Sequence, residues 1–145
     1  MTLPRRHLAL ACLAALAACA APSDAPRFQG RLSAAAELPP NATRGTGTVR
    51  VTLNRATRVM AYELDFRNLS GPAIAAHFHA PGGAGEQAGI RIALIGVARA
   101  PGPITGEIGL SPEEVADLLA GRWYVNIHTP SHPDGEIRAQ LVPET

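Results

Sequence analysis

The chain has few charges, few aromatic residues and no lysine. Of its 145 residues, 17% are charged and 4% are aromatic, and all 13 basic residues are arginine. These arginines are scattered, so the sequence lacks the positive patch that is typical of a nucleic-acid-binding protein. With 46% hydrophobic residues, the chain is too apolar to remain disordered. We therefore expect one folded domain that has an aliphatic core and binds no nucleic acid.

Only two cysteines are present, Cys12 and Cys19, and both lie near the N-terminus. Arg5 and Arg6 precede an apolar stretch at residues 8–18. This stretch is shorter than the about 20 residues that span a bilayer, but its length suits the centre of a secretory signal peptide. Residues 16–19, Leu-Ala-Ala-Cys, resemble the lipobox of a bacterial lipoprotein. The resemblance implies cleavage before Cys19, which then carries the lipid anchor.

This interpretation divides the chain into a signal peptide at 1–18, a flexible tether at 19–27 and a domain at 28–143. Cys12 leaves with the signal peptide, so the mature monomer forms no disulfide. Ala20 after the cysteine is similar to the sorting pattern of Gram-negative outer-membrane lipoproteins. We expect a protein of the bacterial cell envelope, lipid-anchored in the outer membrane and facing the periplasm or the surface. The alternative is an ordinary signal peptide in which Cys19 is incidental.

Apolar residues alternate with polar ones along most of the domain, which is typical of strands with one buried face. The expected strands lie at 28–32, 49–53, 60–66, 74–79, 90–95, 104–110, 123–129 and 136–142. Pro133-Asp134-Gly135 is expected to form the turn before the last strand. Ser111, Pro112 and Glu114 predict a capped helix that ends at Gly121. The predicted fold is all-β, an antiparallel immunoglobulin-like or Greek-key β-sandwich of about eight strands with one short helix.

Three histidines form the strongest candidate site. His77 and His79 are two residues apart on an expected strand, so both face outward, and His128 offers a third imidazole. Three neutral imidazoles suit zinc or copper. The pattern is similar to the copper site of copper/zinc superoxide dismutases, but the remaining histidines and the disulfide of that family are missing. Alternatively, the three histidines hydrogen-bond neighbouring backbone or carboxylates and so order a turn. Glu136 and Arg138 share an outward face, and a carboxylate there could fix the imidazole tautomers.

Seven motifs occur in an order that resembles the chordin-type (CHRD) domain, a family found in the animal protein chordin and in many bacterial secreted proteins. The motifs are ELPP (37–40), GTV (47–49), LSG (69–71), AHFH (76–79), LAG (119–121), YVNIHT (124–129) and GEIRAQ (135–140). The resemblance implies an extracytoplasmic, immunoglobulin-like β-sandwich, and it supplies no established activity.

The sequence contains no evident nucleophile or acid/base constellation, so we expect no enzyme. We expect a lipid-anchored binding or envelope module, with the membrane and an unknown protein or small ligand as partners. The alternatives are a copper- or zinc-binding protein that uses a surface histidine cluster, an enzyme of superoxide-dismutase type, and a structural adhesin. The glycine-rich loop at residues 80–89 is a candidate lid beside the histidines.

Overall fold

The computed structural model describes residues 25–97 and 102–144, so the expected signal peptide and Cys19 lie outside the described residues. Within these ranges the chain forms nine strands, one α-helix and one short 3-10 helix. In chain order they are β1 (Arg27–Ser33), η1 (Ala34–Ala36), β2 (Thr46–Asn54), β3 (Val59–Arg67), β4 (Ala75–His79), β5 (Ile90–Ala93), β6 (Ile104–Gly109), α1 (Pro112–Leu119), β7 (Tyr124–Thr129), β8 (His132–Gln140) and β9 (Val142–Pro143).

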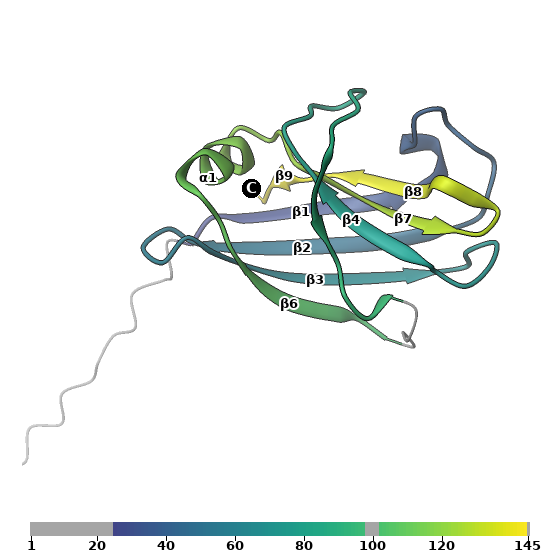
Figure 1. Ribbon diagram of the computed structural model, residues 1–145, viewed down its shortest axis with the longest axis horizontal. Coiled ribbons are helices and arrows are strands. Elements are labelled where there is room, and N and C mark those ends of the chain that lie inside the picture. Colours follow the sequence, from purple (N-terminus) through teal and green to yellow (C-terminus); the bar gives the residue numbers. More distant parts are fainter. Residues whose placement is uncertain (1–24, 98–101, 145) are drawn as a thin grey trace, which may run out of the picture.

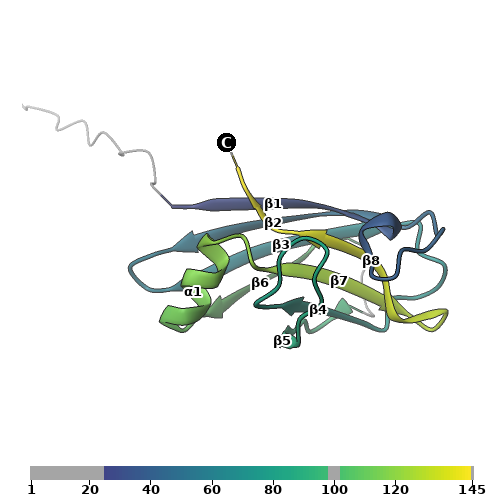
Figure 2. The same ribbon diagram turned by 90° about the horizontal axis from the view of Figure 1, so that it is seen from above.

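The strands form one continuous antiparallel sheet. Their order is β5-β4-β7-β8-β1-β2-β3-β6, and the short β9 pairs with β1. Figures 1 and 2 show that the sheet curls into a half-barrel, which brings its β4–β7 and β2–β3 regions to face each other. The prediction of an all-β antiparallel fold with one short helix is confirmed. The two layers expected of a sandwich are the two halves of this curled sheet.

The core fills the concave side of the sheet and is mostly aliphatic, as the scarcity of aromatic residues implied. Alternate residues of each strand point into it, because successive side chains of a strand lie on opposite faces. Phe78 of β4 packs near Trp123, with ring centroids 6.1 Å apart. Both side chains are fully buried. The intervening residues of β4 and β7, including all three candidate histidines, therefore lie on the outer face of the sheet.

Helix α1 begins as the sequence predicts. Ser111 is its N-cap, and the Glu114 amide donates to the Ser111 hydroxyl while the Glu114 carboxylate accepts from the Ser111 amide. Pro112 occupies the first helical position, where its missing N–H costs nothing. The predicted capping box is confirmed, and Leu118 of this helix is buried in the core.

The predicted turn at Pro133-Asp134-Gly135 is wrong, because these residues lie inside β8. The turn between β7 and β8 is at Pro130 and Ser131, and Thr129 pairs with His132. The register shifts between Ile127 and Thr129, so the extra residues of β8 form an irregularity opposite His128. Gly135 takes a positive φ of 135° there, a backbone conformation that favours glycine. The turn-forming residues thus shape an irregular strand rather than a hairpin turn.

Glu136 and Arg138 lie on the outer face of β8, as predicted, but both are buried and they form no ion pair with each other among the described residues. The Glu136 carboxylate accepts hydrogen bonds of 2.7 Å from the Ser70 amide, the Ser70 hydroxyl and the Thr129 hydroxyl. Burial raises the pKa of Glu136, but these hydrogen bonds outweigh it and lower the pKa overall. Glu136 therefore ties the Ser70 loop to the end of β7, next to His128.

We expect Glu136→Ala to lower the free energy of unfolding by at least about 3 kcal/mol, because it leaves buried donors without an acceptor. Chemical denaturation of the variant measures this loss. The matched control is Glu107→Ala, which removes an exposed carboxylate from β6 and should change stability by less than about 0.5 kcal/mol. Equal effects of the two substitutions would contradict this role of Glu136.

Candidate metal centre

The three candidate histidines come together at the pairing of β4 with β7. His77 lies opposite Asn126, and His128 lies opposite Ala75, so His77, His79 and His128 are near neighbours on one face. The outward direction predicted for them is confirmed. The predicted exposure of these histidines to solvent is wrong for His79 and His128, which are only 7% and 8% exposed. His77 is half-buried.

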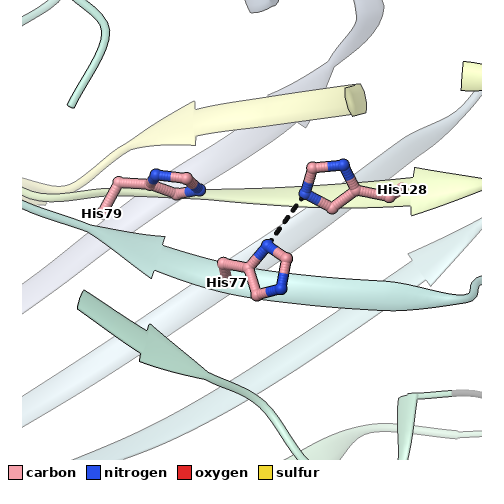
Figure 3. Close-up of side chains that lie close together, drawn as sticks. All are labelled: His77, His79 and His128. Atoms are coloured by element: carbon pink, nitrogen blue, oxygen red, sulfur yellow. Dashed lines mark hydrogen bonds between the residues drawn. The ribbon is translucent and has the colours of Figure 1, made fainter. Parts of the chain in front are cut away.

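The imidazoles point toward one another, as Figure 3 shows. His77 Nδ1 lies 3.0 Å from His128 Nε2, and one ligand atom from each of the three rings lies within 4.8 Å of the others. Nitrogen ligands about 2.0–2.1 Å from a shared tetrahedral metal are roughly 3.4 Å apart. A ring movement of about 1 Å would therefore bring the three nitrogens to coordination distance. The three histidines could form a metal site.

Backbone carbonyls fix the tautomers of two of these rings. His79 Nδ1 lies 2.9 Å from the Ala88 carbonyl oxygen, and His128 Nδ1 lies 2.9 Å from the Pro133 carbonyl oxygen. A carbonyl only accepts, so each Nδ1 carries the proton and donates it. The Nε2 atom of each neutral ring then keeps its lone pair. Metal-binding histidines are held in this way, with the second ring nitrogen donating to an acceptor behind it.

Asn126 lies between these two lone pairs. Its Oδ1 atom is 2.9 Å from His79 Nε2 and 3.0 Å from His128 Nε2. With both Nδ1 atoms protonated, the Nε2 lone pairs of both rings face the Asn126 side-chain amide beside His77. Asn126 was not among the predicted site residues, although its position two residues before His128 places it on the same face.

The predicted carboxylate partner for the imidazoles is absent from the described part of the chain, where the two Nδ1 atoms donate to backbone carbonyls instead. Ala88 belongs to the glycine-rich loop at residues 80–89, so the predicted lid does lie against the histidines. Pro133 belongs to the irregular part of β8. One carbonyl therefore comes from the loop that crosses the outer face, and the other comes from the irregular part of β8.

A stack of three side chains extends the site along β7 and β8. The Tyr124 ring is parallel to the His79 ring, with centroids 4.6 Å apart. The guanidinium carbon of Arg138 lies over the Tyr124 ring, 3.5 Å from its centroid. Arg138 also donates to the carbonyl oxygens of Gly83 and Glu86 in the covering loop. The stack therefore holds His79 and the loop in place together.

Burial and neighbouring imidazoles favour the neutral forms of His77 and His128. Burial lowers the pKa of His77, and His128 and His79 lower it further. Burial also lowers the pKa of His128, against the opposing effect of its hydrogen bond to Pro133. The usual pKa of histidine is about 6.5, so both rings are neutral at pH 7. Neutral imidazole is the form that binds metal.

Glu37 is an unusual carboxyl group beside this site. It is 5% exposed, its Oε1 atom has no hydrogen-bond partner among the described residues, and it lines a pocket of about 420 Å³ with His79 and His128. Burial raises its pKa to about 7, although the positive charge of Arg138 acts in the opposite direction. Folding therefore favours the protonated form of Glu37.

We expect Glu37→Gln to remove a pH-dependent loss of stability. The raised pKa means that the wild-type protein loses stability as the pH rises from about 4.5 to about 7, whereas glutamine does not ionise. The shift corresponds to about 3 kcal/mol. The free energy of unfolding of the variant, minus that of the wild type, should rise by that order across this range. A constant difference would contradict burial of an ionisable Glu37, and Glu107→Gln serves as the exposed control.

Comparison with known proteins identifies the family. The model of the CHRD domain family matches residues 28–141, a stretch that contains every residue of the candidate centre. No curated protein and no solved structure was found to match the chain. In the described ranges, no helix is both long and apolar enough to cross a membrane. The resemblance noted in the sequence is confirmed, and the chain belongs to the CHRD domain family.

Proposed function

We propose that this protein is a lipid-anchored CHRD-domain module of the bacterial cell envelope that binds a zinc or copper ion through His77, His79 and His128. The proposed role is binding, without catalysis. The observation that carries the metal proposal is the pair of hydrogen bonds from His79 and His128 to backbone carbonyls. They aim two imidazole lone pairs at one point beside a third imidazole.

The donor set favours zinc or copper over magnesium or calcium. Three neutral imidazole nitrogens are borderline ligands that suit zinc and copper, whereas magnesium and calcium prefer carboxylate, carbonyl and water oxygens. The Asn126 amide oxygen is the one oxygen at hydrogen-bond distance from two of the rings. With three protein nitrogens, a zinc or copper ion would keep a coordination position for another ligand.

An enzyme of superoxide-dismutase type is the less favoured alternative. Such enzymes resemble this protein in having a copper-binding histidine pair on a β-strand. Here there are three imidazoles, and His79 and His128 contact backbone carbonyls and the Asn126 amide. Copper binding alone does not separate the two functions. Superoxide consumption by the copper-loaded protein, measured against free copper, distinguishes catalysis from binding.

We expect the full-length protein to bind one Zn(II) or Cu(II) ion in isothermal titration calorimetry at pH 7, at micromolar concentration or below. His79→Ala and His128→Ala should each weaken binding at least tenfold, because each removes a ligand. Affinity should fall in acid, because protonated imidazoles do not bind metal. No binding of either metal below millimolar concentration would contradict the proposal.

His132→Ala is the matched control for these variants. His132 lies at the start of β8, close in sequence to His128, but it is not part of the histidine cluster. The control should retain the wild-type affinity and stoichiometry. Circular dichroism spectra of all three variants show whether a loss of binding comes from a lost ligand or from loss of the fold.

The proposed lipid anchor rests on the sequence around Cys19, with its basic start, short apolar stretch and small residues before the cysteine. The tether after it would hold the domain close to the membrane. Attachment through several acyl chains is much more stable than attachment through one. The domain is thereby kept at the membrane surface.

We expect the protein expressed in a Gram-negative host to fractionate with membranes, and Cys19→Ser to release it from them or to leave the signal peptide uncleaved. Mass spectrometry of the mature N-terminus should show an acylated Cys19. Cys12→Ser is the control and should not change the fractionation, because Cys12 lies in the removed segment. An unmodified N-terminus at another residue would contradict the anchor.

A further inference from the structure

The pocket beside the histidines contains two buried groups of complementary chemistry that do not pair. The pocket is lined by the candidate metal-site residues His79, Asn126 and His128 together with Glu37 and Arg138. Its volume of about 420 Å³ is at the small end of the range for ligand sites. His77 is not among the lining residues. A metal held by all three histidines would therefore have His77 behind it and the pocket in front of it.

Arg138 is a buried cation without a counterion in the described part of the chain. It is 3% exposed, and no ion pair joins it to a carboxylate there. Its Nη2 atom donates to the carbonyl oxygens of Gly83 and Glu86, and Tyr124 covers one face of the guanidinium. Burial of an unpaired charge is costly, so this position favours an anion.

Glu37 supplies the second group. Its Oε1 atom is buried and has no hydrogen-bond partner among the described residues. The positive charge of Arg138 acts to lower the pKa of this carboxyl group, but the two side chains form no ion pair in the described part of the chain. A ligand between them can accept hydrogen bonds from Arg138 and receive a hydrogen bond from a protonated Glu37. A planar carboxylate has this arrangement of acceptors and matches the fork of the guanidinium.

The net charge of the loaded site also favours an anion. Three neutral imidazoles leave a divalent ion with its charge of +2, and Arg138 adds +1. The carboxyl groups of Asp134 and Glu37 also line the pocket, and together they contribute a charge of at most −2. The pocket thus stays positive when the metal is bound. The rim is held by a hydrogen bond of 2.8 Å from the Gln87 side chain to the Leu38 carbonyl oxygen.

We propose that this pocket binds a small organic carboxylate, which occupies the open coordination position of the metal ion and is held by Arg138 and Glu37. The inference rests on the proposed metal function, because the ion supplies one of the three contacts. It goes beyond that function by assigning the pocket a ligand class and two residues that hold the ligand.

The test uses acetate as the probe and the full-length, detergent-solubilised protein. Acetate is titrated into the Cu(II)-loaded and the metal-free protein, and the copper absorption band and the broadening of the acetate methyl signal in NMR are followed. We expect saturable binding to the loaded protein that is at least tenfold tighter than to the metal-free protein. Phosphate and methylammonium should bind at least tenfold more weakly than acetate.

Arg138→Gln should weaken acetate binding at least tenfold. Wild type and variant are compared at full copper occupancy, because Arg138 also holds the loop that orients His79. Arg138→Lys, which keeps the charge but loses the planar fork, should give a smaller loss. Arg50→Gln removes an exposed arginine of β2 and is the matched control, which should behave as the wild type. The wild-type NMR measurement stands by itself if the Arg138 variants fail to fold.

The outcomes separate the two proposals. If copper binds and acetate shows no saturable effect, the carboxylate site is overturned and the metal function stands. If phosphate binds more tightly than acetate, the ligand class is wrong. If copper does not bind at all, the metal function fails, and the carboxylate site, which needs the ion, fails with it.

Discussion

The candidate centre depends on two hydrogen bonds, from His79 Nδ1 to Ala88 and from His128 Nδ1 to Pro133. Each sets the tautomer of a buried ring, and together they turn two Nε2 lone pairs toward Asn126. Neither carbonyl belongs to a regular ladder position. One lies in the loop that crosses the outer face, and the other lies where β8 departs from regular pairing. The irregular segments of the fold are thus the ones that orient the candidate ligands.

These segments are held by buried polar groups rather than by the apolar core. Arg138 joins the Tyr124 ring to the covering loop, and Glu136 ties the Ser70 loop to Thr129, the residue after His128. The core lies on the other side of the same strands. The two faces of these strands therefore differ. The inner face carries the aliphatic core that stabilises the sheet, and the outer face carries the buried polar side chains that shape the site.

Much of this could be predicted from sequence, because strand alternation depends only on local geometry. It predicted that His77 and His79 share a face, and the capping residues predicted helix α1. Strand alternation could not show that this face is covered, because the residues that cover it belong to the loops at 37–41 and 80–89. For the same reason, strand alternation placed Glu136 and Arg138 on the outward face without showing that they are buried. Local turn chemistry predicted a turn at Pro133-Asp134-Gly135, where β8 instead forms an irregular strand segment.

The central claim is that His79 and His128 present Nε2 atoms prepared for a metal ion. Long-range ¹H–¹⁵N NMR spectra of histidine side chains, recorded without and with Zn(II), test it most directly. We expect both rings to carry their proton on Nδ1 in both states, and zinc to shift the two Nε2 resonances. A proton on Nε2 of either ring in the metal-free protein, or Nε2 resonances that zinc leaves unchanged, would contradict it.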